Sequence, residues 1–194
     1  MKVALIPARG GSQRIPHKNR KLFLGLPIIL YAIRAAKKAK LFDRIIVSTD
    51  DVETAAICAQ EGNVWPIYRP ASLAGDEVGT QAVAQHAAGL MPSDYMCVIY
   101  ATTPLMQAID IERGYRVLRE HEHFNFAMSV GTEPLQDAGQ FYFGRTWAFR
   151  AGKDLISAHT AMIPIQSRYV CDINTIEDFE RAEIMYKANE EQPE

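Results

Sequence analysis

Residues 3–19 read VALIPARGGSQRIPHKN, an apolar run followed by a loop rich in glycine, serine, proline and basic residues. The run at residues 3–7 carries no polar side chain, which is typical of a strand buried on both faces of a sheet. The composition of residues 8–19 predicts a loop. A proline at position 27 then opens an amphipathic helix over residues 28–40. This order of strand, loop and helix indicates the first half of a βαβ unit.

The same alternation continues along the chain. The predicted strands cover residues 44–49, 63–68, 95–100, 124–130 and 140–143, and the predicted helices cover residues 52–61, about ten residues from position 80, 109–120 and 175–187. Such alternation produces right-handed crossovers and a mostly parallel sheet with helices on both sides. We therefore predict one α/β domain over residues 1–194, with a polar, frayed end over the last seven residues.

The composition narrows the class of protein further. With 48% hydrophobic and 23% charged residues, the chain has the balance of a globular protein and not of a disordered one. No stretch approaches the roughly 18 apolar residues that span a bilayer, which predicts no membrane segment. Three cysteines, Cys58, Cys97 and Cys171, lie far apart without metal-binding spacing. They indicate reduced thiols in a cytoplasmic protein.

Basic residues are concentrated in the first part of the chain. Residues 1–44 hold 11 of the 21 Lys and Arg residues and a single acid, Asp43. This asymmetry indicates an anionic ligand near the N-terminus. A small phosphorylated ligand is favoured over nucleic acid, because the rest of the chain is acidic and would repel a polyanion. Part of the excess lies in the helix at residues 28–40, where a solvated helix face explains it equally well.

The loop at residues 8–19 is the first candidate site, because ligands of open α/β sheets bind beyond the carboxyl ends of the strands. Gly10 and Gly11 allow backbone N–H groups to approach an anion. Arg9, Arg14 and Lys18 add positive charge for a polyphosphate. The loop matches neither GxxxxGK[ST] nor GxGxxG, so it is not a P-loop or a dinucleotide fingerprint. The alternative is a tight turn with surface cations.

Six motifs in order carry a resemblance to a known family. The segment IPARGGSxRIPxKN at residues 6–19 resembles the nucleotide-binding signature of cytidylyltransferases that act on nine-carbon acidic sugars, the family of the CMP-sialic acid synthetases. The other motifs are IIVSTD at 45–50, Arg69-Pro70 with Leu73 and Asp76, IYATTPL at 99–105, DAGQFYFG at 137–144 and RYVCDINTIED at 168–178. The combination of DAGQFY with YATTP is most similar to the pseudaminic acid branch.

This resemblance implies a Rossmann-like three-layer α/β/α nucleotidyltransferase fold and a chemical reaction. CMP would pass from CTP to a nonulosonic acid, in the first place pseudaminic acid, with release of pyrophosphate and with Mg²⁺ as cofactor. The product would serve surface or flagellin glycosylation. A homodimer is implied, and neither nucleic acid nor a membrane is an expected partner. Sialic acid, legionaminic acid and 3-deoxy-octulosonate remain alternative acceptors, and a degenerate homologue that binds nucleotide without turnover remains an alternative function.

The resemblance also assigns roles to particular residues. Arg9, Lys18 and Asp172 would be catalytic, and Asp172 with Asn174 would hold Mg²⁺. The expected nucleotide-binding residues are Ala8, Arg9, Gly10, Gly11, Ser12, Arg14, Lys18, Asn19, Arg69, Thr102 and Thr103, and the expected sugar-binding residues are Asp137, Gln140 and Tyr142.

Some of these assignments have structural alternatives. Arg69 could be a surface arginine before a proline turn, and Thr102 and Thr103 could be caps at a strand end. Asn174 could be the N-cap of the last helix, and the segment at residues 140–143 could be a plain edge strand.

Three features depart from the family's pattern. Gln13 stands where a lysine is usual in the phosphate loop, and Asn174 replaces the second carboxylate of an Asp-x-Asp pattern. Residues 131–136 form a shortened connection. Family members carry a longer insertion there, which contributes to sugar binding and forms the arm of the homodimer. The shortened connection leaves the nucleotide half of the site intact but opens the sugar site.

Overall fold

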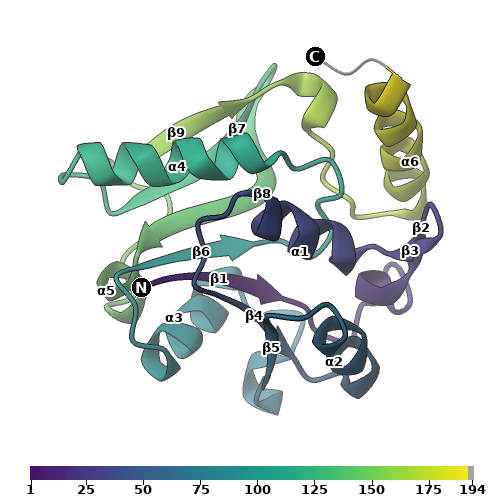
Figure 1. Ribbon diagram of the computed structural model, residues 1–194, viewed down its shortest axis with the longest axis horizontal. Coiled ribbons are helices and arrows are strands. Elements are labelled where there is room, and N and C mark those ends of the chain that lie inside the picture. Colours follow the sequence, from purple (N-terminus) through teal and green to yellow (C-terminus); the bar gives the residue numbers. More distant parts are fainter. Residues whose placement is uncertain (192–194) are drawn as a thin grey trace.

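The computed structural model describes residues 1–191, which form a sheet of seven strands between two layers of helices (Figure 1). The strands of this sheet are β1 (Lys2–Pro7), β4 (Arg44–Thr49), β5 (Val64–Tyr68), β6 (Tyr95–Ile99), β7 (Phe126–Thr132), β8 (Leu135–Arg145) and β9 (Thr160–Ile165). Their order is β5-β4-β1-β6-β8-β7-β9. All neighbours pair in parallel except β8, which is antiparallel to β6 and β7. The predicted α/β class and mostly parallel sheet are confirmed.

Helices cover both faces of this sheet. They are α1 (Ile29–Lys38), α2 (Val52–Ala59), α3 (Thr80–Leu90), α4 (Ala108–Glu120), α5 (Thr146–Arg150) and α6 (Ile176–Glu191). Side chains of α1, α2 and α4 pack with Ala4 and Ile6 of β1, whereas those of α3 and α5 pack with Val3 and Leu5. Because successive strand residues point to opposite faces, the unbroken apolar run of β1 serves both layers.

The last helix packs at one end of the sheet, beside the hairpin of β2 (Leu22–Phe23) and β3 (Leu26–Pro27) (Figure 1). Phe179 of α6 and Phe23 of β2 meet edge to face, with ring centroids 5.5 Å apart. Ile15 from the first loop and Ile173 from the segment before α6 join the same buried cluster. This cluster brings the N-terminal loop and the C-terminal segment together, although they lie far apart in the sequence.

The connection between β7 and β8 explains why β8 is antiparallel. Thr132 pairs with Leu135, so only Glu133 and Pro134 lie between the strands. A connection of two residues can return the chain only in the antiparallel sense. The shortened segment at residues 131–136 is therefore the tip of a β-hairpin. The strand predicted at residues 140–143 is longer than expected and internal to the sheet, so the edge-strand alternative is wrong.

Several elements differ from the sequence-based expectation. The strand β9, the helix α5 and the β2–β3 hairpin were not predicted, since each is short or lacks a turn signal at its start. The expected fraying is wrong for residues 188–191, which continue α6 to Glu191. Asn189 Nδ2 donates to the backbone oxygen of Arg168 at 2.9 Å and ties this end of the helix to the body of the protein. The remainder of that expectation, residues 192–194, lies outside the described residues.

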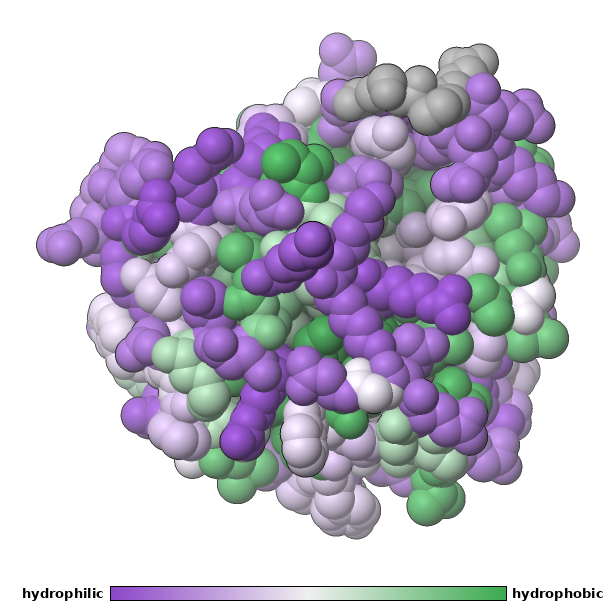
Figure 2. Space-filling view, viewed as in Figure 1, coloured by the Kyte–Doolittle hydropathy of each residue, from purple (hydrophilic) through white to green (hydrophobic). Residues whose placement is uncertain are grey.

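The basic side chains of α1 lie at the surface. Arg34 and Lys38 are exposed, and Arg34 and Lys37 lie 3.3 Å and 3.2 Å from the carboxylate of Glu61. Figure 2 shows mainly hydrophilic side chains over the face that carries α1 and α4. This part of the N-terminal charge excess is a solvated helix face, so the charges left for a ligand are those of the first loop. All three cysteines are buried free thiols, and no helix among residues 1–191 is long and apolar enough to cross a membrane.

Gly144 of β8 provides a test of the packing between the sheet and α5. A Cβ atom at this position would lie 2.6 Å from Phe149 Cε2 and 2.8 Å from Phe126 Cε1. We expect Gly144→Ala to lower the free energy of unfolding by about 1–3 kcal/mol, because the two rings must move apart. Gly89→Ala is the matched control: nothing lies within 4 Å of its added Cβ on α3, and alanine there should stabilise the helix by about 0.5–1 kcal/mol. Urea unfolding of both variants measures these opposite effects, and equal midpoints would contradict the packing described.

Candidate active site

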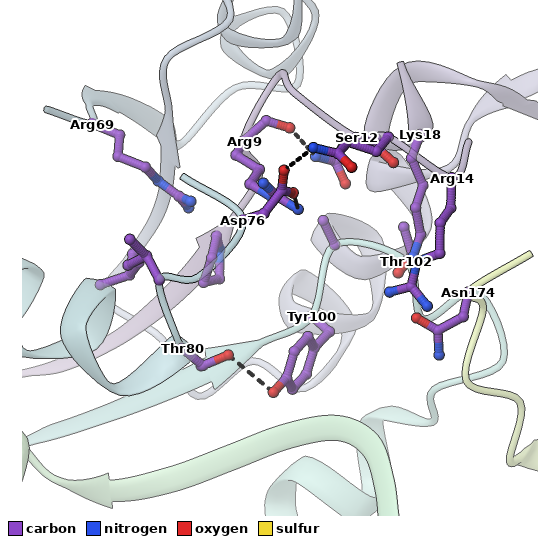
Figure 3. A pocket seen from close by; sticks show the side chains of 16 residues that line it. Arg9, Ser12, Arg14, Lys18, Arg69, Asp76, Thr80, Tyr100, Thr102 and Asn174 are labelled. Atoms are coloured by element: carbon purple, nitrogen blue, oxygen red, sulfur yellow. Dashed lines mark hydrogen bonds and ion pairs between the residues drawn. The ribbon is translucent and has the colours of Figure 1, made fainter. Parts of the chain in front are cut away.

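A cavity of about 450 Å³ opens where β1 and β6 end (Figure 3). It is lined by Pro7, Arg9, Ser12, Gln13, Arg14, Lys18, Asn19, Arg69, Asp76, Val78, Thr80, Val83, Tyr100, Ala101, Thr102 and Asn174. Four of these side chains are cations and one, Asp76, is a carboxylate. A cavity at the carboxyl ends of parallel strands with an excess of positive charge suits an anionic ligand.

The structure brings together most of the predicted nucleotide-binding residues. The cavity is lined by Arg9, Ser12, Arg14, Lys18, Asn19, Arg69 and Thr102, and by Asn174 of the predicted metal pair. Outside this lining lie Ala8, Gly10, Gly11, Thr103 and Asp172, together with the predicted sugar-binding residues Asp137, Gln140 and Tyr142. The cavity thus corresponds to the nucleotide half of the predicted site.

Hydrogen bonds to its backbone hold the first loop in place. Asn19 Nδ2 donates to the backbone oxygen of Arg9 at 2.8 Å. The N–H of Gly10, which we had expected to face an anion, donates instead to Asp50 Oδ1 at 2.8 Å. A Cβ on Gly10 would lie 3.0 Å from Asp51 Cβ, so this glycine allows the loop to approach the start of α2 closely. Asn19 and Asp50 are therefore positioning residues for Arg9.

Lys18 links the first loop to the segment that precedes α6. Its Nζ donates to the backbone oxygen of Ile173. Burial lowers the pKa of the Lys18 amine below its ordinary value, while the nearby carboxylate of Asp172 acts in the opposite direction. Burial has already removed part of the hydration of this ammonium group. The further free-energy cost of desolvation is therefore smaller when the group binds a phosphate. Lys18 thus lies between the first loop and the predicted metal pair of Asp172 and Asn174.

Arg69 is buried and not a surface arginine, so that alternative is wrong. It is 3% exposed, and its guanidinium donates to the backbone oxygen of Ser48 at 2.9 Å and to Ser48 Oγ at 3.3 Å. Burial lowers the pKa of Arg69, and the charge of Asp50 opposes this effect. These contacts fix the side chain at the end of β4, where it forms one wall of the cavity (Figure 3).

Thr102 and Thr103 have different surroundings. Thr103 is buried, and its Oγ1 donates to the backbone oxygen of Tyr100 at 2.8 Å, which is the strand-end cap that we considered as an alternative. Thr102 lines the cavity. Only Thr102 is therefore placed to meet a ligand directly.

Asp172 and Asn174 form a pair at the edge of the cavity. Asn174 Nδ2 donates to Asp172 Oδ2 at 2.5 Å. The cap of α6 is Thr175, whose Oγ1 accepts from the N–H of Asp178 at 3.2 Å while Asp178 Oδ2 accepts from the N–H of Thr175 at 2.9 Å. This is a reciprocal capping arrangement. The N-cap alternative for Asn174 is wrong, and its side chain is free to serve the cavity.

Comparison with known proteins identifies the family. A family model described as Cytidylyltransferase matches residues 3–144. The chain belongs to the cytidylyltransferase family. The match includes the first loop, Arg69 and the strand end at Thr102, which together line the cavity.

Similar sequences and structures agree with this assignment. An alignment of 226 positions, gaps included, relates the chain to the pseudaminic acid cytidylyltransferase of Campylobacter jejuni with 32% identity. It covers 97% of this chain and 97% of that one. It is 28% identical to the N-acylneuraminate cytidylyltransferase of Escherichia coli over 130 residues, which cover 66% of this chain and 30% of that one. A structure titled CMP:2-keto-3-deoxy-manno-octonic acid synthetase complexed with CTP has a TM-score of 0.81 at 14% identity, and covers 97% of this chain and 99% of that one. That likeness establishes the nucleotidyltransferase fold.

In this cytidylyltransferase, the predicted sugar-binding residues lie beside the cavity and not within its lining. Tyr142 OH donates to the carboxylate of Asp137, and burial raises the pKa of Tyr142, with Asp137 acting in the same direction. Gln140 is 2% exposed and its Nε2 donates to the backbone oxygen of Tyr169 at 2.5 Å. Gln140 therefore anchors η3 (Ser167–Tyr169), which leads into the segment with Asp172.

Two observations place the Asp137 region next to Asp172. A Cβ on Gly139 would lie 3.4 Å from Asp172 Oδ1, and the N–H of Gly139 donates to Asp137 Oδ1 at 2.9 Å. Burial raises the pKa of Tyr100, and the charges of Asp137 and Asp172 both add to the effect. Tyr100 also lines the cavity. The cavity, the Asp172–Asn174 pair and the hairpin of β7 and β8 thus adjoin one another around Tyr100.

Sequence reasoning missed several residues of the site. Tyr100 and Thr80 line the cavity, and their hydroxyl groups lie 3.0 Å apart. Tyr100 directly follows a predicted strand and Thr80 begins a predicted helix, so their positions at element ends were the available signal. Asp76 and Asp50 were quoted only as parts of motifs, because nothing in the sequence places either beside the first loop.

The donor set at residues 172–174 fits Mg²⁺. This ion prefers oxygen ligands and is held by one or two protein groups together with substrate phosphates and water. Asp172 offers a carboxylate, and Asn174 offers an amide oxygen, because its hydrogen bond to Asp172 is donated by Nδ2. Among the described residues, no group of three or more His, Cys, Asp or Glu side chains is placed to hold a metal by itself. A metal at this position would therefore depend on the phosphates of the nucleotide.

Proposed function

We propose that this cytidylyltransferase transfers CMP from CTP to a nonulosonic acid, and that the acceptor is pseudaminic acid. The observation that carries the proposal is the cation-lined cavity, formed by the motifs that the chain has in common with cytidylyltransferases. The named activity of the Campylobacter jejuni relative, which matches over 97% of this chain, supports the choice of acceptor. Relatives that match less of the chain are named for sialic, legionaminic and 3-deoxy-octulosonic acids.

The nucleotide would bind with its phosphates along the first loop. Arg9, Arg14 and Lys18 supply three positive charges, and all three side chains face the cavity in Figure 3. Arg69 lies at the opposite side of the view and would face the nucleoside end of CTP. Fixed cations of this kind neutralise the negative charge that develops on a transferred phosphoryl group, and they need no rearrangement during the reaction.

The transfer exchanges one bond to phosphorus for another. The anomeric hydroxyl oxygen of the sugar bonds to the α-phosphorus of CTP, the hydroxyl proton is released, and the bond to the pyrophosphate oxygen breaks. Arg9 and Lys18 would hold the leaving pyrophosphate in line with the attacking oxygen. Mg²⁺ held by Asp172 and Asn174 would neutralise phosphate charge and lower the pKa of the attacking hydroxyl.

The acceptor would bind between Tyr100 and the β7–β8 hairpin, near Asp137. This region adjoins Asp172 through Gly139, so a sugar there would lie next to the metal pair and the α-phosphate. The connection at residues 131–136 is only a hairpin tip, which leaves this side of the site open. The homodimer implied by the family resemblance stays a prediction, and sedimentation of the purified chain tests it.

Pyrophosphate release is the direct test of this function. The purified protein is incubated with CTP and Mg²⁺, together with pseudaminic acid, sialic acid or no sugar. We expect release with pseudaminic acid only. Release with sialic acid alone would contradict the assigned acceptor. Absence of release with every sugar, on a sample that binds CTP by calorimetry, would contradict turnover and support the degenerate nucleotide-binding homologue.

A further inference from the structure

Among residues 1–191, Asp76 is the one acidic side chain in the lining of the cavity. It lies on the loop between η2 (Ala71–Leu73) and α3, and its carboxylate reaches across to the first loop. One oxygen forms an ion pair with the Arg9 guanidinium, and the other accepts from Gln13 Nε2. Figure 3 shows Asp76 beside Arg9, in the part of the cavity that lies between Arg69 and Lys18.

A carboxylate in this position makes the contacts that a phosphate group would make. Arg9 pairs with one carboxylate oxygen as it would with a phosphate oxygen, and Gln13 supplies a neutral donor to the other. The terminal nitrogen of Arg9 that now pairs with Asp76 is not open to a phosphate oxygen in the same position, and the two anions repel each other. A phosphorylated ligand must therefore displace Asp76 from Arg9 before its phosphates can bind there.

We propose that Asp76 competes with the phosphates of the nucleotide for Arg9 and so sets the affinity of the cavity for phosphorylated ligands. This inference rests on the proposed function, since it takes the first loop as the triphosphate site. A ligand with several linked phosphates carries enough charge to displace one carboxylate. A nucleoside without phosphates gains nothing by displacing it. The competition thus lowers the affinity for the triphosphate and leaves the affinity for uncharged cytidine analogues unchanged.

The expected size of the effect follows from exposure. The side chains of Arg9 and Asp76 are 31% and 37% exposed, so water and salt screen their ion pair, and such a pair contributes little. Removal of the competing charge should therefore raise the affinity for a phosphorylated ligand by about three- to tenfold, and not by orders of magnitude. The gain should be the same for any ligand whose phosphates reach Arg9.

The test compares Asp76→Asn with Glu77→Gln by calorimetry without sugar, at fixed ionic strength. Glu77 is the neighbouring exposed acid and lies outside the cavity lining, so its variant removes the same charge without touching Arg9. The ligands are CTP, inorganic tripolyphosphate and cytidine. We expect Asp76→Asn to bind CTP and tripolyphosphate about three- to tenfold more tightly than the unmodified protein. Cytidine affinity and all affinities of Glu77→Gln should stay unchanged.

Other outcomes separate this inference from the proposed function. Weaker CTP binding by Asp76→Asn, or an equal gain in Glu77→Gln, would overturn the competition. A gain for tripolyphosphate in a protein that does not bind CTP would support the competition and contradict the proposed function. If neither the unmodified protein nor Asp76→Asn binds CTP or tripolyphosphate, both the competition and the proposed function are overturned.

Discussion

Replacement of Arg9 by alanine should abolish measurable turnover by weakening CTP binding by about 100-fold or more. A guanidinium that makes charge-assisted hydrogen bonds contributes about 3 kcal/mol, which corresponds to roughly a hundredfold in affinity. Loss of Arg9 also leaves the carboxylate of Asp76 without its ion pair, facing the phosphates. Calorimetric titration with CTP measures the affinity, and pyrophosphate release at saturating sugar measures the turnover.

Two further variants distinguish a phosphate-binding role from a structural one. Arg116→Ala removes an exposed arginine of α4 outside the cavity lining and should leave CTP affinity and thermal unfolding unchanged. Arg9→Ala combined with Asp76→Asn should bind CTP more tightly than Arg9→Ala alone, because the unpaired carboxylate is gone. Unchanged CTP affinity in Arg9→Ala would show that the first loop is a turn with surface cations and not a phosphate site.

The parts of the fold that were predictable are those with strong local signals. The run at residues 3–7 and the alternation of strands and helices predicted β1, β4, β6, α1 and α4 to within a few residues. The failures share a physical cause, which is that pairing across the sheet determines short elements. TAMIPI in β9 alternates between buried and exposed residues, and that pattern was present in the sequence. However, no local sequence signal distinguishes this six-residue strand from a loop, because the helix that precedes it, α5, was itself not predicted.

The site divides in the same way. Arg9, Lys18 and Asn19 were predictable because they follow one strand in a recognisable motif. The contacts of Asp50 and Asp76 with the first loop span 40 and 63 residues, and only the tertiary structure creates them. Burial of Gln140 also depends on tertiary structure, since an alternating pattern allowed it to face either a ligand or the protein interior. Sequence patterns thus identified the cations that line the cavity, but not the carboxylates that contact the first loop.

Asp172 and Asn174 should respond to substitution in opposite directions. Asp172→Asn removes the one charge that the pair offers to a cation, so we expect turnover to fall by about 100-fold or more. Asn174→Asp restores a second carboxylate next to the first, at a position where the two side chains now approach to 2.5 Å. Two carboxylates so close repel each other unless a cation lies between them. We therefore expect this variant to reach half of its maximal rate at several-fold less Mg²⁺.

Initial rates of pyrophosphate release as a function of Mg²⁺ concentration, at saturating CTP and sugar, measure both effects. Thermal unfolding serves as the control for folding. Asp172 is exposed, so its variant should unfold at the same temperature, whereas Asn174→Asp should be less stable without Mg²⁺ and recover when the ion is added. Full turnover in Asp172→Asn would show that the carboxylate only positions Asn174. An unchanged Mg²⁺ dependence in Asn174→Asp would show that the metal binds elsewhere. Since one substitution removes a ligand charge and the other adds one, a general disturbance of the segment before α6 cannot produce both expected results.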